Sequence, residues 1–541
     1  MTKSTILYIL SFIIMGVMVL MMFSSLEYTS PWGWRGFNVL TSSDATLLHQ
    51  ISKDFIKHPA SILDWDFGTC FNMYPTFFIM LLNTFTFTNP SIVVFSTALI
   101  HFSLLILLIN ILLKKINDKI SIYSLIISNL SILIFLEYAI KTNDFGLFTS
   151  YLFLPYHLGA FINAICSLIL AFSYFKKQEL KYLIPFIIIN ILAVFSDFIY
   201  IIYFILPFIL AVSTFLFFLK SIHKKGYIII TISLILSAIF GYILQKAIIF
   251  FNVLHILPYQ SLSENMFLSL KLMSTDLFNI IINGGISTLI ALLALFSIIV
   301  TVYFIITILF KNKSLDSGKT HLLLYLLFVV YFFILTIAAP VLNGFYRGID
   351  CIRYIIPAIY LVIFNLGLLT DLLLIKYAHK IKYIAIILIV IHITFISIFY
   401  SKNNPTQSIE KIRNYYPSIV HSIDSLSKKY SIKNGVANFW DSRFTTVFSK
   451  QHVCVNTIVP PFNPHCFANN SYSYLYADYT SNKPLIYNFI VLDNFTDTAG
   501  IYKVFNKNSL KKVTIDTFEF YLVPDFILNK ELNTFELVHK E

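Results

Sequence analysis

Acidic, imidazole and guanidinium side chains gather in a few short segments of a chain that is otherwise strongly apolar. The two candidate catalytic carboxylates are Asp44, which opens an amphipathic stretch, and Asp197, which interrupts the apolar run 184–219. Ionisable groups at membrane depth are costly unless they serve a cavity, and carboxylates are typical general bases. Asp44 could instead cap a helix, and Asp197 could mark a polar turn between two spans. These residues predict a catalytic or binding cleft in which either carboxylate could act.

Positively charged side chains near the ends of other apolar runs could bind an anionic group. Arg347 and Arg353 flank the start of one run, and the planar guanidinium fork matches phosphate oxygens. A salt bridge to Asp350 would explain the same arginines. Lys246 and His157 could join this phosphate site, although Lys246 could also extend along the apolar surface and keep its ammonium group in the interface.

Two further pairs of residues have the spacing of a ligand set or of a crosslink. Asp64 and Asp66 could approach one divalent cation, Mg²⁺ or Mn²⁺, or could lie in a solvated loop. Cys454 and Cys466 could form a disulfide in an oxidising compartment. The sequence requires no cofactor, because it contains no Gly-rich phosphate loop, no Cys/His zinc spacing and no Gly-x-Ser-x-Gly motif.

The composition of the chain is that of a membrane protein. Of 541 residues, 57% are hydrophobic and 12% are charged, and the mean hydropathy is +0.78. The net charge of +12 comes largely from lysines in short loops between apolar runs, a distribution typical of cytoplasmic loops. This placement excludes a nucleic-acid partner and predicts contact with membrane lipids.

About eleven apolar runs predict transmembrane helices, and the lysine-rich loops place the N-terminus in the cytoplasm. The runs are 6–23, 91–113, 120–139, 150–174, 182–197, 199–219, 226–250, 283–310, 320–339, 353–375 and 381–400. The shorter run 75–87 would break this parity, so we expect a re-entrant or interfacial helix there, within an outer loop at 26–90. Residues 1–400 then form the membrane domain, and residues 401–541, with short β-rich runs, form a soluble domain outside. We therefore expect a polytopic α-helical membrane protein with a small C-terminal extracytoplasmic α/β or α+β domain.

This architecture and several loose motifs resemble the GT-C class of polytopic membrane glycosyltransferases of the bacterial type. The motifs are Ser43-Asp44-Ala45-Thr46 in the first outer loop, the helix start Arg353-Tyr354-Ile355-Ile356-Pro357, and Val436-Ala437-Asn438-Phe439-Trp440-Asp441-Ser442-Arg443 in the tail. The resemblance implies a polyprenyl-phosphate-linked sugar donor, with Asp44 as base or metal ligand and the Asp64/Asp66 pair as a second candidate. A carboxylate would remove the acceptor's hydroxyl proton or stabilise positive charge on the sugar, while arginines or a metal hold the lipid phosphate.

The resemblance also implies a location and partners. It places the chain in a bacterial inner membrane, with the C-terminal domain periplasmic or extracellular and a cell-envelope glycan or lipid as acceptor. Two other classes are compatible with the sequence: a transporter, flippase or polymerase of lipid-linked saccharides, and a non-catalytic membrane scaffold. A transporter usually needs charges along a path through the membrane, whereas the acidic residues singled out here lie near the outer ends of the runs. The sequence therefore favours the glycosyltransferase.

Overall fold

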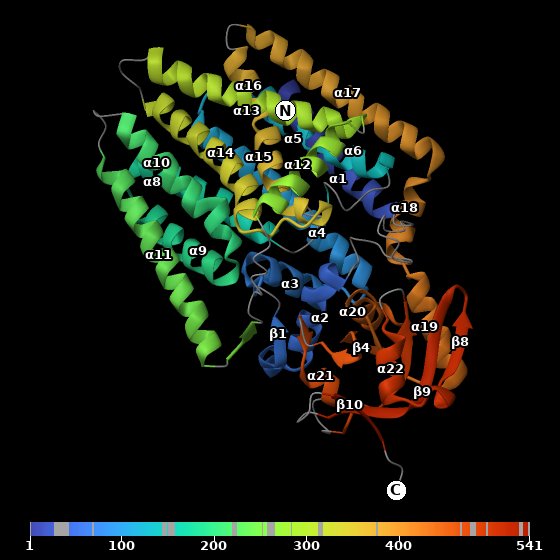
Figure 1. Cartoon of the computed structure of the whole chain (residues 1–541). Coiled ribbons are helices and arrows are strands. Elements are labelled where there is room, and N and C mark those ends of the chain that lie inside the picture. Colours follow the sequence, from blue (N-terminus) through green and yellow to red (C-terminus); the bar gives the residue numbers. More distant parts are fainter. Residues whose placement is uncertain are drawn as a thin grey trace.

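The protein consists of a bundle of long helices and, at one end of the bundle, a smaller part that contains strands (Figure 1). The computed structural model describes residues 2–25, 43–67, 70–142, 149, 157–218, 224–251, 253–256, 266–282, 284–311, 317–374, 377–465, 468–476, 483–493, 496–529 and 534–538. The N-terminal end lies in the bundle, on the side away from the strands, and the C-terminal end lies beyond the strands.

Ten helical segments in the described ranges are long and apolar enough to cross a membrane. They are α1 (Lys3–Ser24), α4 (Pro90–Ile116), α5 with α6 (Ile122–Ser131, Leu133–Thr142), α8 (Leu158–Lys177), η4 with α10 (Ile201–Ile205, Leu206–Phe218), α11 (Lys225–Phe250), α13 (Ile286–Lys311), α14 (Ser317–Leu342), α15 with α16 (Ile356–Phe364, Leu366–Leu373) and α17 (Ala378–Lys402). The remaining expected span corresponds to α9 (Leu180–Ser196), which is apolar but only 17 residues long. The expectation of a multi-pass helical protein is confirmed.

Polar side chains make hydrogen bonds between these apolar helices. Asn110 of α4 donates its amide to Asn129 of α5 over 2.9 Å, and Tyr325 of α14 donates its hydroxyl to Asn365, between α15 and α16, over 2.5 Å. Such pairs fix how neighbouring helices are rotated against each other, because an unpaired polar group is costly among apolar side chains.

Close contact between α5 and α16 depends on a glycine. A Cβ atom at Gly367 would lie 2.0 Å from the carbonyl oxygen of Ser124 and 2.3 Å from the hydroxyl oxygen of Ser128. We expect Gly367→Ala to destabilise the bundle by about 1–3 kcal/mol, because the two helices would have to move apart. The measurement is the thermal unfolding midpoint of the detergent-purified protein. Gly16→Ala in α1 is the control, since nothing lies within 4 Å of a Cβ there; equal midpoints for the two variants would contradict the prediction.

A group of short elements lies between the bundle and the C-terminal strands (Figure 1). It comprises α2 (Ser43–Lys57), η2 (Pro59–Asp64), β1 (Trp65–Phe67), η3 (Met73–Phe77) and α3 (Phe78–Thr86). The nine residues of α3 cover the run expected not to span, and they are too few to cross a bilayer. The helix α12 (Met266–Ile282) was not expected from the sequence.

The C-terminal part contains a mixed sheet with helices, as the expectation of an α/β or α+β domain requires. The strand order is β10-β9-β7-β3-β4-β5, with β8 paired to β9; β3 runs parallel to both β4 and β7. The strands are β3 (Asn434–Ala437), β4 (Cys454–Val459), β5 (Asn463–Pro464), β7 (Tyr487–Leu492), β8 (Lys511–Ile515), β9 (Phe518–Asn529) and β10 (Thr534–Leu537). The helices are α18 (Pro405–Arg413), α19 (Ser418–Tyr430), α20 (Phe439–Phe448), α21 (Tyr472–Leu475), α22 (Thr498–Val504) and η7 (Lys507–Ser509).

A second, three-stranded sheet joins distant parts of the chain. Its central strand β1 pairs with β2 (His255–Ile256), which follows α11, and with β6 (Asn469–Asn470) of the C-terminal part. Trp65 in β1 is fully buried, and the carboxylate of Asp54 in α2 accepts a hydrogen bond from the Asn470 amide over 3.1 Å. The C-terminal part is therefore attached to the first loop by main-chain as well as side-chain hydrogen bonds.

Candidate functional site

A pocket of about 530 Å³ lies at one end of the helical bundle, where α8 begins and α9 and α14 end. Its walls come from the turn between α9 and η4, the end of α14 and the loop after it, and η5 (Ile349–Tyr354). The lining residues are Cys70, His157, Asp197, Phe198, Ile199, Ile202, Tyr203, Thr336, Ala339, Pro340, Asn343, Phe345 and Tyr354. The volume lies within the range of small-molecule sites, and most of the wall is apolar or aromatic with a few polar groups, as is usual for such sites.

His157 and Asp197 form a close pair in this pocket. The Nδ1 atom of His157 lies 2.5 Å from Oδ2 of Asp197, and the two side chains are 11% and 7% exposed. Asp197 follows the last residue of α9, and its other oxygen, Oδ1, accepts a hydrogen bond from the backbone N–H of Ile199 over 3.1 Å. The carboxylate is therefore held in one orientation toward the imidazole.

The backbone around this pair is held by a set of specific contacts. Asn72 donates its N–H to the carbonyl oxygen of Ser196 over 3.2 Å, and Tyr74 donates its N–H to the Ser196 hydroxyl oxygen over 3.0 Å. The amide of Asn163 in α8 donates to the Tyr74 carbonyl oxygen over 3.2 Å. At Gly159 a Cβ atom would lie 2.8 Å from the Thr76 hydroxyl oxygen. These contacts hold three segments in fixed positions relative to one another: the segment after β1, the start of α8 and the end of α9.

Tyr354 forms another side of the pocket. Its ring lies 5.5 Å from the ring of His157, and its backbone carbonyl oxygen accepts a hydrogen bond from the Tyr203 hydroxyl over 3.3 Å. Burial raises the pKa of Tyr354, so its phenol stays a hydrogen-bond donor at neutral pH. The Arg353 guanidinium lies 5.2 Å from the centre of the same ring and donates to its hydroxyl oxygen over 3.3 Å.

Of the residues singled out from the sequence, the structure brings His157 and Asp197 together in the pocket. Arg353 contacts the lining residue Tyr354, and Lys246 lies over the ring of Tyr242, which in turn contacts the lining residue Phe198. Arg353 is thus next to a lining residue, whereas Lys246 is separated from the pocket by Tyr242. Arg347 is exposed and is not among the residues that line the pocket.

The three carboxylates that the sequence singled out in the first loop, Asp44, Asp64 and Asp66, are not among the described residues that line the pocket. Asp44 lies in the first turn of α2, and its side chain is outside the described part of the structure. Asp64 and Asp66 flank the buried Trp65; the Asp64 carbonyl oxygen accepts from the backbone and hydroxyl of Ser471 over 2.8 Å each. They belong to the junction with the C-terminal part, and neither lines the pocket.

One group of metal-ligating side chains occurs in the described ranges, and it is not the expected one. Cys70, His157 and Asp197 each offer one ligand atom, and these atoms lie within 4.8 Å of one another. Asp64 and Asp66 are not part of such a group among the described residues. The sequence pattern missed Cys70 because its partners lie 87 and 127 positions further along the chain, so no local spacing marks the site.

The expected disulfide is not formed by Cys454, whose side chain is a free thiol at the start of β4. Burial raises the pKa of this thiol to about 12. Cys466 lies outside the described residues. Cys454 is partly buried and packs against apolar side chains of the sheet without a crosslink.

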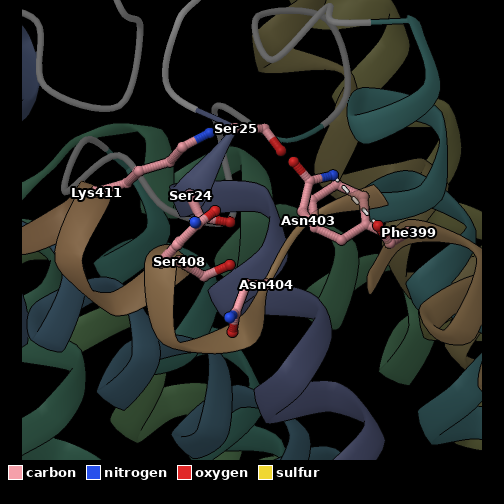
Figure 2. A pocket seen from close by; sticks show the side chains of 8 residues that line it. Ser24, Ser25, Phe399, Asn403, Asn404, Ser408 and Lys411 are labelled. Carbon is pink, nitrogen blue, oxygen red and sulfur yellow. Dashed lines mark hydrogen bonds between the residues drawn. The ribbon is translucent and has the colours of Figure 1, made fainter. Parts of the chain in front are cut away.

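A second pocket, of about 240 Å³, lies where α1 ends beside α17 and α18 (Figure 2). It is lined by Ser24, Ser25, Phe399, Asn403, Asn404, Gln407, Ser408 and Lys411. The Asn403 amide donates to the carbonyl oxygen of Phe399 over 3.2 Å. Since no carboxylate or imidazole is among these described lining residues, the larger pocket is the better candidate for chemistry.

A pair of acidic side chains is partly buried in the C-terminal part. Asp441 in α20 and Asp493, which follows β7, both accept hydrogen bonds from the amide of Asn438; the contact to Asp441 is 2.7 Å. Burial raises the pKa of Asp441 to about 7, the charge of Asp493 acts in the same direction, and the hydrogen bond from Asn438 opposes the shift. Between about pH 4 and pH 7, Asp441 therefore keeps a proton in the folded protein that it has released in the unfolded chain.

This proton makes the stability of the protein depend on pH. The usual pKa of an aspartate is 3.8, so stability falls as the pH rises from about 4 to about 7 and stays lower above it. We expect Asp441→Asn to raise stability at pH 8 by on the order of 2 kcal/mol. The rise in pKa from 3.8 to about 7 corresponds to about 4 kcal/mol, since one pKa unit is worth about 1.4 kcal/mol, but Asp441 is only partly buried and solvent screening reduces this cost. Thermal unfolding of the full chain from pH 5 to 8 measures this; a variant that keeps the wild-type pH dependence would contradict it.

The comparisons with known proteins leave this pocket to be interpreted from its geometry. No protein-family model matches the chain, and no curated protein and no solved structure matches it significantly.

Proposed function

We propose that this protein is a membrane glycosyltransferase that transfers a sugar from a polyprenyl-phosphate-linked donor to a cell-envelope glycan or lipid. The observation that carries the proposal is the His157–Asp197 pair, held at 2.5 Å in a largely apolar pocket at the end of the helical bundle. A lipid-linked donor requires a site of this kind, because its polar head reacts while its chain stays among apolar side chains.

The pocket supplies groups for each part of the reaction. The Asp197 carboxylate, directly or through the His157 imidazole, would accept the proton of the acceptor hydroxyl as it attacks the sugar. Phe198, Ile199 and Ile202 provide apolar wall for the first part of the lipid chain. Arg353 lies beside the lining residue Tyr354, and Lys246 lies one ring further out beside Tyr242; their charges would attract the phosphate toward the pocket.

The distribution of lysines supports a periplasmic or extracellular position for the pocket, and a bacterial inner membrane as the location. Lys114 and Lys115 lie in the last turn of α4, and Lys176 and Lys177 in the last turn of α8. The last turn of α8 lies at the opposite end of this helix from His157, which lines the pocket. At this end the Nζ atom of Lys176 lies 2.8 Å from Oδ1 of Asp118, which follows α4. Cytoplasmic loops are enriched in lysine and arginine. We therefore assign the lysine-rich helix ends to the cytoplasm and the pocket to the opposite side of the membrane.

A transporter of lipid-linked saccharides is the second candidate, and one observation favours it. Glu137 of α6 and His392 of α17 lie within candidate spans, and His392 Nδ1 is 2.7 Å from Glu137 Oε1. Ionisable pairs at membrane depth commonly belong to proton or substrate pathways. This pair does not line the pocket of about 530 Å³, so the two candidates depend on different residues.

Deletion of the gene followed by mass spectrometry of the surface glycans and lipids tests the proposal. We expect one sugar to be lost from the mature glycan and restored by wild-type protein but not by Asp197→Asn. Accumulation of an unmodified acceptor together with the unused lipid-linked sugar on the outer face identifies a transferase. Retention of the lipid-linked saccharide on the inner face would overturn the proposal and favour the transporter.

A further inference from the structure

We propose that Cys70, His157 and Asp197 bind a Zn²⁺ ion, and that the ion keeps one coordination position open for a phosphate oxygen of the donor. The three ligand atoms lie within 4.8 Å of one another on the wall of the pocket. Cys70 and Asp197 are 6% and 5% exposed, so bulk water competes little with such an ion. The proposal of a zinc ion stands on this geometry, and its role toward phosphate rests on the proposed function.

The set of ligand atoms selects the metal. Thiolate, imidazole and carboxylate are the three ligand types that Zn²⁺ takes in proteins, and three protein ligands with one open position are typical of reactive zinc sites. Mg²⁺ and Mn²⁺ prefer oxygen ligands and a higher coordination number. The sulfur of Cys70 therefore argues against the Mg²⁺ or Mn²⁺ that the sequence suggested for Asp64 and Asp66.

The arrangement fits a metal better than a thiol nucleophile. In a Cys-His-Asp relay the thiol and the carboxylate lie on opposite sides of the imidazole ring, each at a different nitrogen. Here the Cys70 sulfur and the Asp197 carboxylate oxygen lie within 4.8 Å of each other as well as of a His157 ring nitrogen. This separation is too short for a sulfur and an oxygen on opposite sides of the imidazole ring.

The backbone fixes the three ligands before any ion binds. His157 has a left-handed backbone with φ of 56°, directly before the first residue of α8. Asn72, two residues after Cys70, is bonded to Ser196, which precedes Asp197. The Asp197 oxygen that does not face His157, Oδ1, is held by the N–H of Ile199; it would stay outside the coordination sphere and remain the atom that accepts the proton of the acceptor hydroxyl. Such fixed outer contacts orient ligands and contribute substantially to metal affinity.

The charge balance of the pocket gives the ion a role. A phosphate-linked donor brings negative charge, yet none of the described lining residues is a lysine or an arginine. Arg353 and Lys246 lie behind the rings of Tyr354 and Tyr242. A Zn²⁺ ion on Cys70, His157 and Asp197 would supply the positive charge inside the pocket, next to the leaving phosphate oxygen.

Metal analysis of the full-length protein tests the proposal without any substrate. The protein, purified in detergent without chelators, should contain about one zinc ion per chain. After chelation, Co²⁺ should restore the site and give the absorption band of a thiolate–cobalt bond. Addition of inorganic phosphate should shift the cobalt spectrum.

Three variants make the result specific. Cys70→Ser should lose the thiolate band and weaken zinc binding by about 100-fold or more, because it removes a direct ligand. Cys351→Ser and Cys166→Ser are matched controls, since neither cysteine belongs to the group, and both should keep zinc. Wild-type protein without zinc and without a thiolate band overturns the site, as does normal zinc binding by Cys70→Ser. A cobalt spectrum that does not change when phosphate is added would overturn the proposal of an open coordination position. Zinc bound to a protein that transfers no sugar would instead overturn the proposed function alone.

Discussion

Asp197→Asn should lower the rate of sugar transfer by about 100- to 10,000-fold while leaving the protein folded. An amide cannot take up the proton of the acceptor hydroxyl, and proton transfer by a positioned group is worth about this factor. The substitution is nearly isosteric, and the Asn oxygen can still accept the hydrogen bond from Ile199. His157→Gln should give a loss in the same range, because His157 Nδ1 is the partner of the carboxylate. The assay is single-turnover transfer from a polyprenyl-phosphate sugar in nanodiscs.

Two other carboxylates provide the controls for this prediction. Asp276 in α12 accepts a hydrogen bond from Tyr346 over 3.0 Å and does not line the pocket, so Asp276→Asn should transfer sugar at close to the wild-type rate. Asp44→Asn separates the two carboxylates singled out from the sequence. Asp197→Asn with more than a tenth of wild-type activity, combined with an inactive Asp44→Asn, would move the base to the first loop.

The helical spans could be predicted from the sequence because the signal is local. Long apolar runs and lysines between them determine which segments cross a membrane, and each expected run contains a helix in the structure. α12 was missed because Lys271 and Asp276 interrupt its apolar pattern, although Phe267 and Phe278 on it are more than half exposed. A helix whose apolar sequence is broken by charged residues lacks the uninterrupted apolar run of about 20 residues by which a span is recognised.

The pairing of His157 with Asp197 could have been inferred from the topology. α8 has 20 residues and α9 has 17, and only two residues separate them. Two helices joined by so short a connection are antiparallel neighbours, so the residue before the first and the residue after the second return to the same end. Both side chains were unexplained polar groups in apolar surroundings, and the hairpin brings them together.

The position of the first loop could not be inferred in this way. Asp64 and Asp66 look like a metal-binding pair along the sequence, but β1 pairs with β6, about 400 residues further along the chain. Strand pairing over such a distance depends on the tertiary packing around Trp65 and leaves no local pattern. The same holds for Cys70, whose position follows from the hydrogen bonds between Asn72, Tyr74 and Ser196.

The Glu137–His392 pair should be a strong determinant of stability in the helical bundle. The two side chains are 13% and 4% exposed, and the second ring nitrogen of His392 has no hydrogen-bond partner. We expect His392→Leu to destabilise the protein by about 3–5 kcal/mol, because it leaves a buried carboxyl group without its partner. The thermal unfolding midpoint of the purified full-length protein measures the effect.

Two further variants determine whether the pair serves stability or transport. Glu137→Gln keeps an oxygen that can accept the hydrogen bond, so it should cost less than His392→Leu. The double variant Glu137→Leu/His392→Leu removes both polar groups and should recover much of the lost stability, since apolar side chains of similar size often replace a buried pair without loss. If these variants instead keep the wild-type unfolding midpoint and lose only the surface glycan, the pair acts in function rather than folding. That result would favour the transporter, because the pair lies within the spans and apart from the pocket of His157 and Asp197.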